Sequence, residues 1–222
     1  MTDPEILIKA KRWLNAPYDP STQKEVQQLI ESDPEGLIDA FYKDLDFGTG
    51  GLRGTMGVGS NRVNRYTLGM ATQGLANYLK RSFSEPIRVV ISHDSRHHSR
   101  EFAVQTAEIL SANGMDAFLF PDLRPTPLLS FAIRHLGCQS GIMITASHNP
   151  PEYNGYKVYW SDGGQLVPPH DKAVIDEVRQ VAADAVLFDA DPGRIHELGT
   201  EVEEAYLEKL KSVSLGNSGK KD

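Results

Sequence analysis

The sequence predicts a three-layer α/β/α fold with a mostly parallel, mixed sheet, preceded by an N-terminal helical segment. Short apolar runs alternate along the chain with segments of helical periodicity. Three runs are typical of buried strands: residues 87–92 (IRVVIS), 116–120 (DAFLF) and 141–145 (GIMIT). Strands that alternate with helices favour an open sheet whose parallel strands are covered on both faces.

A fourth apolar run, residues 156–160 (YKVYW), is followed by the turn Ser161-Asp162-Gly163-Gly164 and by residues 165–167. This pattern is typical of a strand, a tight turn and a returning strand. We therefore expect some antiparallel pairing, which makes the sheet mixed.

The first 47 residues predict a helical extension. Apolar residues recur at helical spacing over residues 3–14, 21–31 and 33–45. Asp-Pro pairs at positions 3, 19 and 33 each place a capping acid before a proline in the first helical position. We expect three helices, one beginning at each pair.

Five further helices are expected within residues 48–213. The first begins at Thr67, the second is capped by Ser99 and ends at Gly114, and the third runs from Thr126-Pro127 to Gly137. Two more cover about residues 169–183 and 201–213. Residues 214–222 (SLGNSGKKD) have the composition of a linker, which we expect to lead toward a second domain outside this chain.

The composition argues against several classes of protein. The 222 residues include 30 acidic and 23 basic side chains, a net charge of -7, which disfavours nucleic acid as a partner. No apolar run approaches the roughly 18 residues of a membrane span, and the N-terminus lacks the pattern of a signal peptide. The single cysteine, Cys138, excludes an internal disulfide and a thiolate zinc site. We expect a cytoplasmic protein.

One stretch departs from this acidic balance. Residues 53–100 contain eight arginines and lysines against two acids, which favours a local anion site. The start of this stretch overlaps the glycine-rich segment of residues 48–59 (GTGGLRGTMGVG), which has six glycines. Such a segment lets backbone N–H groups approach an anion, and Arg53 adds a planar charged donor. It matches neither a Walker loop nor a dinucleotide fingerprint, and a flexible connector is the alternative.

A second candidate segment is residues 145–151 (TASHNPP), directly after a predicted buried strand. Ligands bind at the carboxyl ends of strands in open α/β sheets, so Ser147 stands at a favourable position. The prolines at 150 and 151 exclude the strand-to-helix elbow of an esterase. In extended backbone His148 points away from Ser147 and is a poor proton acceptor for it. Ser147 therefore suits phosphate carriage, or else forms a turn without chemistry.

Lys157, on the strand after this segment, is a candidate acid or base at the same edge of the sheet. The alternative is an ordinary exposed lysine. Arg96, in the HDSR run after an earlier strand, is a weaker candidate.

Three motifs together resemble the phosphohexomutase superfamily of phosphoglucomutases and phosphomannomutases. They are GTGGLRG at 48–54, TASHNP at 145–150 and NGYKVY at 154–159. The run FYKDLDFGTGGLRGTMG and the helical segment with Trp13 resemble the long phosphoglucomutase and phosphopentomutase-like branch.

The resemblance implies that Ser147 is a phosphoserine that donates its phosphate to a sugar phosphate and takes another back through a bisphosphorylated sugar. Lys157 matches the proton-transfer lysine, Arg53 the arginine near the phosphoserine, and His148 the histidine of the serine loop. Thr49 matches a loop threonine that contacts phosphate.

The resemblance covers only the first domain of such an enzyme. The family binds Mg²⁺ through an Asp-x-Asp-x-Asp loop of a second domain, and this chain has no such pattern. The only metal contact implied here is the phosphate on Ser147, and a sugar bisphosphate is the implied activator.

We therefore expect an extension over 1–47, domain I over 48–213 and a linker over 214–222. The expected partners are hexose or pentose phosphates and the remaining domains of the parent chain, with no nucleic acid or membrane. The function implied is that of an intramolecular phosphotransferase that interconverts hexose 1-phosphate and hexose 6-phosphate, and the fragment alone is expected to be inactive. A phosphosugar-binding module without catalysis is the alternative, and an α/β domain acting through protein contacts is a second.

Overall fold

The apolar runs that alternate with helices form the parallel half of the sheet. In the computed structural model, which describes residues 3–48 and 50–214, they become β3 (Arg88–His93), β4 (Asp116–Leu119) and β5 (Ser140–Ile144). β3 pairs in parallel with both β4 and β5. A short strand that the sequence did not predict, β7 (Ile195–Glu197), pairs in parallel with the outer side of β4.

The other half of the sheet is antiparallel. β6 (Tyr153–Trp160) pairs with β5, β2 (Gly51–Thr55) pairs with β6, and β1 (Phe47–Gly48) pairs with β2. The seven strands lie in the order β1-β2-β6-β5-β3-β4-β7. The prediction of a mixed sheet is confirmed, with the parallel pairs grouped on one side of β5 and the antiparallel pairs on the other.

Two local expectations differ from the structure. The glycine-rich segment is only partly a loop, since its middle forms β2, and residues 165–167 form no returning strand. Gln165 makes an isolated bridge to Tyr159 instead. Both outcomes follow from the pairing of β2 with β6. β2 occupies the edge of β6 along which a longer returning strand would have to pair, because β5 occupies the other edge.

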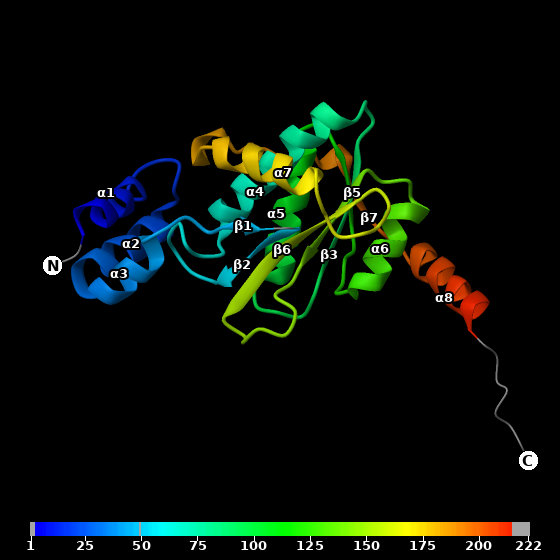
Figure 1. Ribbon diagram of the computed structural model, residues 1–222, viewed down its shortest axis with the longest axis horizontal. Coiled ribbons are helices and arrows are strands. Elements are labelled where there is room, and N and C mark those ends of the chain that lie inside the picture. The colour runs from blue at the N-terminus through cyan, green and yellow to red at the C-terminus, as the bar shows by residue number, and fades with distance from the viewer. Residues whose placement is uncertain (1–2, 49, 215–222) are drawn as a thin grey trace, which may run out of the picture.

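Helices cover both faces of the sheet and produce the predicted three layers (Figure 1). The helices of the main domain are α4 (Arg65–Ser82), α5 (Ser99–Ala112), α6 (Thr126–His135), α7 (His170–Gln180) and α8 (Glu201–Val213). Leu75 of α4 and Leu110 of α5 share a buried cluster with Ile91 of the sheet. Leu129 of α6 shares a second cluster with Val90, on the opposite face. Neighbouring strand residues point to opposite faces, so each face has its own core.

The helix boundaries show how local signals act. Gly114 and Gly137 have positive φ, 83° and 64°, and follow the ends of α5 and α6 as predicted. α4 begins at Arg65, two residues before the predicted Thr67, because Asn64 and Thr67 form a reciprocal capping box. The N-cap of α5 is His98 and not Ser99, which the sequence predicted. Ser99 is the first residue of the helix, and its hydroxyl donates to Asp94.

The helical extension begins where the Asp-Pro pairs predicted. Its helices are α1 (Pro4–Arg12), α2 (Pro20–Ser32) and α3 (Pro34–Phe41), capped by Asp3, Asp19 and Asp33. The Trp13 ring stacks on Tyr18 with centroids 4.3 Å apart and meets the ring of Tyr66, from α4, at 5.8 Å. The extension therefore packs through its own apolar core against the start of α4, at one end of the molecule (Figure 1).

A polar contact completes this junction. The Tyr66 hydroxyl donates to the Asp19 carboxylate at 2.8 Å and accepts from the Asp19 backbone N–H at 2.6 Å. Partial burial raises the pKa of the Asp19 carboxyl, but hydrogen bonds from Tyr66 and from the first turn of α2 outweigh it. The pKa of Asp19 is therefore held well below its ordinary value of 3.8.

Replacing Tyr66 by phenylalanine is expected to lower the free energy of unfolding by about 1–2 kcal/mol at neutral pH. Because the folded pKa of Asp19 is depressed, its stabilising contribution is complete above pH 3.8 and is lost as the pH falls toward the folded value. The difference in free energy of unfolding between the wild type and Tyr66→Phe should therefore become smaller as the pH falls below 3.8. Urea unfolding at a series of pH values would measure it. Tyr42→Phe, which changes a tyrosine that is 53% exposed in the same extension, is the control; equal deficits in both variants would contradict the prediction.

Cys138 is buried between α6 and β5, and burial raises the pKa of its thiol to about 12, so it packs as an apolar side chain and not as a nucleophile. In the part of the chain that the structure describes, none of the helices has the length and apolar character needed to cross a membrane.

Candidate functional site

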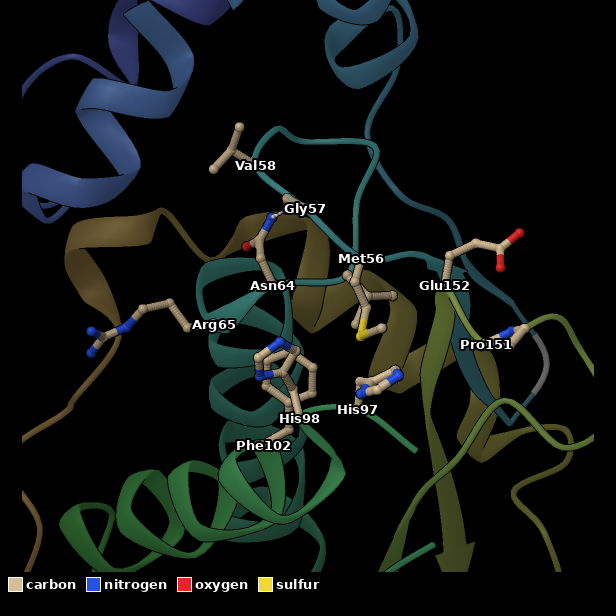
Figure 2. Close-up of a pocket in the computed structure, with 11 residues that line it drawn as sticks. Met56, Gly57, Val58, Asn64, Arg65, His97, His98, Phe102, Pro151 and Glu152 are labelled. Atoms are coloured by element: carbon tan, nitrogen blue, oxygen red, sulfur yellow. Dashed lines mark hydrogen bonds between the residues drawn. The ribbon is translucent and has the colours of Figure 1, made fainter. Parts of the chain in front are cut away.

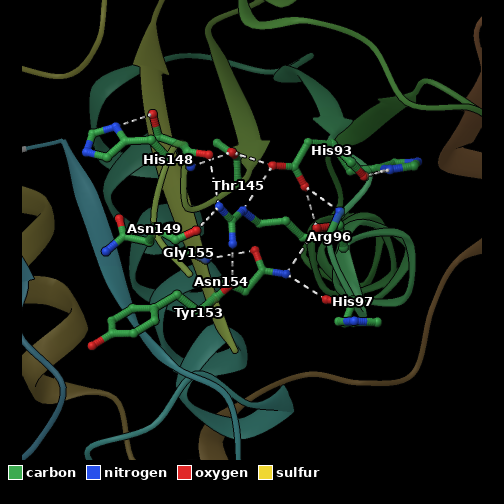
Figure 3. Close-up of polar contacts among 12 residues, drawn as sticks. His93, Arg96, His97, Thr145, His148, Asn149, Tyr153, Asn154 and Gly155 are labelled. Atoms are coloured by element: carbon green, nitrogen blue, oxygen red, sulfur yellow. Dashed lines mark hydrogen bonds and ion pairs between the residues drawn. The ribbon is translucent and has the colours of Figure 1, made fainter. Parts of the chain in front are cut away.

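The serine loop, residues 145–152 between β5 and β6, begins at the carboxyl edge of the parallel strands. Ser147 and His148 are exposed, and Ser147 has φ 59°, in the left-handed region. The expectation of extended backbone was therefore wrong, and with it the inference that His148 points away from the serine. His148 Nδ1 lies 3.4 Å from Ser147 Oγ (Figure 3), a long contact that a small movement would turn into a hydrogen bond.

The backbone of Ser147 is held from the neighbouring loop. Its N–H donates to Thr145 Oγ1 at 2.9 Å, and the Thr145 hydroxyl donates to Asp94 Oδ2 at 2.5 Å. The other oxygen of Asp94 accepts from the Ser99 hydroxyl at 2.8 Å and from the Arg96 backbone N–H at 3.0 Å. The loop after β3 therefore fixes the start of the serine loop through one carboxylate.

Arg96 contacts the same loop further along. Its guanidinium donates to four carbonyl oxygens, those of Ser147 (2.9 Å), Asn149 (2.5 Å), Pro150 (2.8 Å) and Tyr153 (3.1 Å). In Figure 3 this group lies at the centre of the polar network. Asn154 adds a further link, because its side-chain N–H group donates to the carbonyl of His97 at 2.9 Å and to the Ser99 hydroxyl at 3.0 Å.

Arg53 and Lys157 lie together on the antiparallel side of the sheet. The register pairs Gly51 with Lys157 and Arg53 with Gly155, so both side chains stand on the same face. Tyr156 and Val158 point to the opposite face, where they are buried under α4. Arg53 is exposed and Lys157 is half-buried, so both charged groups are accessible to a ligand.

A cleft of about 450 Å³ contains both cations. It is lined by Asp46, Gly48, Gly50, Gly51, Leu52, Arg53, Thr145, Lys157 and Gln165. Thr145 joins the two parts of the site, because it lines this cleft while its hydroxyl holds the N–H of Ser147. The structure thus brings Arg53 and Lys157 together and connects them to Ser147 through one buried threonine.

Glycines keep this face open. A Cβ on Gly155 would lie 2.7 Å from the carbonyl oxygen of Leu52 and 2.8 Å from that of Thr145. Any side chain at this position would push apart β2, β6 and the start of the serine loop. Gly155 therefore lets Arg53 and Thr145 lie close to each other.

Two cavities adjoin the serine loop on its other side. One of about 300 Å³ is lined by Asp94, Ser95, Arg96, His97, Ser147, Asn149 and Pro151. A larger one, of about 710 Å³, shares His97 and Pro151 with it (Figure 2). The Arg65 guanidinium in the larger cavity lies over the ring of Phe188, 5.1 Å from its centroid, and extends away from the His97 imidazole in Figure 2. Ser147 therefore lines the smaller of these cavities, while Arg53 and Lys157 line the cleft that Thr145 connects to it.

The structure does not describe Thr49, so the expectation for that residue lies outside the described residues. Within the described residues no three of His, Cys, Asp and Glu gather as a group that would hold a metal ion. Asp94, the carboxylate linked to Ser147 through Thr145, already accepts from Thr145, Ser99 and Arg96. The described side chains around Ser147 therefore do not form a chelating set for Mg²⁺.

Sequence reasoning missed the residues that hold the serine loop, namely Asp94, Thr145 and Asn154, and gave Arg96 little weight. Asp94 and Arg96 follow β3 as Ser147 follows β5, and β3 and β5 are parallel neighbours. The rule that placed Ser147 at a ligand-binding edge applies equally to the HDSR run. The position of Asp94 and Arg96 after a buried strand could therefore be recognised from the sequence, whereas the carbonyl oxygens that Arg96 contacts could not.

Comparison with known proteins agrees with this geometry. The sequence model of the family described as phosphoglucomutase/phosphomannomutase, alpha/beta/alpha domain I, matches residues 44–184. A human phosphopentomutase is 38% identical over 93% of this chain and 36% of its own length. A phosphoglucomutase of Staphylococcus saprophyticus is 36% identical over 83% of this chain and 37% of its own length. The chain thus spans little more than a third of these relatives.

The fold has matching solved structures. One from Thermus thermophilus, assigned as a phosphomannomutase, is 32% identical and superposes with a TM-score of 0.67 over 77% of this chain and 36% of that one. One from Burkholderia thailandensis, at 22% identity and a TM-score of 0.58 over 75% of this chain and 35% of that one, shares the fold. The family match covers the glycine-rich segment, the serine loop and Lys157. The chain therefore belongs to the phosphoglucomutase/phosphomannomutase α/β/α domain I family.

Proposed function

We propose that this chain is the phosphoserine-bearing domain of a phosphosugar mutase, in which Ser147 receives a phosphoryl group from a sugar bisphosphate and returns it to a sugar monophosphate. The observation that carries the proposal is the placement of Ser147. Its hydroxyl is exposed, its backbone is held by Thr145 and Arg96, and the cleft that Thr145 shares contains Arg53 and Lys157. Phosphoryl transfer depends mainly on positioning and charge neutralisation, which these residues supply.

The transfer exchanges one phosphorus–oxygen bond for another. As Ser147 Oγ bonds to phosphorus, the bond from phosphorus to the sugar oxygen breaks, so that the serine loses its hydroxyl proton and the sugar oxygen gains one. Lys157 is proposed as the group that gives a proton of its own ammonium to the leaving oxygen and takes one back in the return step, while exchange with solvent resets the proton that the serine released. Arg53 neutralises the phosphoryl oxygens, and His148 Nδ1, 3.4 Å from Oγ, accepts the serine proton.

The proposed substrates are hexose or pentose phosphates. The relatives named as phosphopentomutase, phosphoribomutase and phosphoglucomutase support this class, and a sugar bisphosphate is the proposed activator. We also propose that a complete mutase cycle, hexose 1-phosphate to hexose 6-phosphate included, needs the rest of a longer parent chain. Apart from a phosphate on Ser147, Mg²⁺ in such an enzyme would take its ligands from outside the described residues.

The experiment is mass analysis of the tryptic peptide His135–Lys157 after incubation with glucose 1,6-bisphosphate or ribose 1,5-bisphosphate in buffer containing Mg²⁺. We expect one added phosphate on Ser147 that is lost when a sugar monophosphate is added, and none on Ser147→Ala. Ser140, in the same peptide, is an internal control because it is fully buried and donates its hydroxyl to the Tyr159 carbonyl. An unmodified Ser147 in a chain that still binds sugar phosphates would overturn the proposal in favour of a binding module.

A further inference from the structure

Arg96 differs from the other arginines near the site in what its guanidinium contacts. Both terminal nitrogens donate to two carbonyl oxygens each, and Nε lies 3.6 Å from Asp94 Oδ2. A guanidinium has five N–H donors, so the four on the terminal nitrogens are all engaged within this chain and Nε lies beside the Asp94 carboxylate. The side chain is only 13% exposed. Arg96 is therefore not available as a phosphate ligand, in contrast to the exposed Arg53.

The carbonyls that Arg96 holds belong to the turn that carries Ser147. Among the described residues, two other than glycine have positive φ, Ser147 at 59° and His98 at 60°. For a serine this conformation is strained and persists where the surroundings impose it. Both residues lie in the two loops that Arg96 joins.

The contacts define both ends of the Ser147 residue. Thr145 Oγ1 accepts from its N–H at 2.9 Å, and an Arg96 terminal nitrogen donates to its carbonyl at 2.9 Å. The same nitrogen donates to the carbonyl of Asn149, two residues on. With the N–H and C=O both held, the direction of the Ser147 side chain follows from the backbone.

We propose that Arg96 is a positioning residue that imposes the left-handed conformation of Ser147 and thereby aims its hydroxyl for phosphoryl transfer. This inference rests on the proposed function for its chemical consequence, while its structural part stands apart from it. The planar guanidinium of Arg96 can donate to four carbonyl oxygens at once. An ammonium has three donors around one nitrogen and cannot reproduce that arrangement, so lysine is not a conservative substitute.

The test compares Arg96→Lys and Arg96→Gln with the wild-type chain by NMR. The amides to follow are Ser147, Asn149 and Tyr153, whose N–H groups bond within the serine loop. We expect them to exchange with solvent about tenfold faster in both variants, and the scalar coupling that reports φ of Ser147 to lose its left-handed value. The amides of Ile142 and Val158, inside the sheet, should keep their protection, which shows that the variants fold. The matched control is Arg134→Lys, because Arg134 also holds a loop carbonyl, that of Asp162, at 3.1 Å but far from the serine.

The second readout is the rate of Ser147 phosphorylation by glucose 1,6-bisphosphate. We expect a loss of about 100-fold in both Arg96 variants, the scale of a misplacement of about 1 Å, with an unchanged donor concentration at half-saturation because Arg53 and Lys157 are intact. Wild-type exchange and rate in Arg96→Lys would overturn the inference. So would a raised half-saturation concentration with unchanged loop exchange, since Arg96 would then contact substrate. If even the wild type is never phosphorylated while loop exchange rises as expected, the proposed function fails and the structural role of Arg96 stands.

Discussion

Replacing Lys157 by methionine is expected to slow phosphoryl transfer to Ser147 by about 10²–10⁴-fold, the range that a positioned general acid or base supplies. Lys157 lies in the same cleft as Arg53 and Thr145, and we propose that its ammonium reaches the leaving oxygen of a sugar phosphate bound there. The measurement is the single-turnover rate of Ser147 phosphorylation from a sugar bisphosphate, followed by mass analysis at timed intervals.

Two further variants separate proton transfer from charge. Lys157→Arg keeps a cation in the cleft but does not release a proton, so it should bind the donor with near wild-type affinity and remain slow. Lys172→Met changes an exposed lysine on α7 and should leave the rate unchanged. A Lys157→Arg chain with the wild-type rate would contradict proton transfer by Lys157 and leave it a purely electrostatic role.

Replacing Gly51 by alanine is expected to lower the free energy of unfolding by about 3 kcal/mol or more. Gly51 has φ 147°, and an added Cβ would overlap the carbonyl oxygen of Tyr156 and come within 3.0 Å of Lys157 Cα. The cost combines an unfavourable backbone conformation with overpacking against a fixed strand. The displaced β2 would also carry Arg53 away from Lys157, so the affinity for inorganic phosphate should fall as well.

The matched control is Gly57→Ala. Gly57 has nearly the same φ, 144°, but a Cβ there meets only the Arg62 side chain at ordinary contact distances of 3.8 and 3.9 Å. Gly57→Ala should therefore lose only the backbone part, about 1–2 kcal/mol, in urea unfolding followed by circular dichroism. Equal losses in the two variants would show that the contact between β2 and β6 does not set the cost.

The features that sequence reasoning predicted well depend on neighbours along the chain. Each Asp-Pro pair begins a helix because the aspartate accepts from N–H groups two or three residues later and the proline already has a helical φ. The parallel strands were predictable because strands buried on both faces must be almost wholly apolar, as in residues 140–144.

The features that it missed depend on distant partners. A segment with six glycines has little strand propensity, and β2 forms because Leu52 and Arg53 pair with Tyr156 and Gly155 about a hundred residues later. The left-handed Ser147 was read as extended because the arginine that holds its carbonyl lies 51 residues earlier in the chain.

The sequence by itself determined the α/β class, the helix starts and the chemical identity of Ser147, Lys157, Arg53 and His148, because capping, periodicity and residue type are local properties. Only the tertiary structure decided that Arg53 shares a face with Lys157, that Thr145 connects their cleft to Ser147, and that the Arg96 guanidinium donates to carbonyl oxygens of the serine loop. The physical reason is that strand register and hydrogen-bond partners depend on residues far apart in the sequence. They are determined only when loops from different strands meet at one edge of the sheet and each buried donor must find an acceptor there.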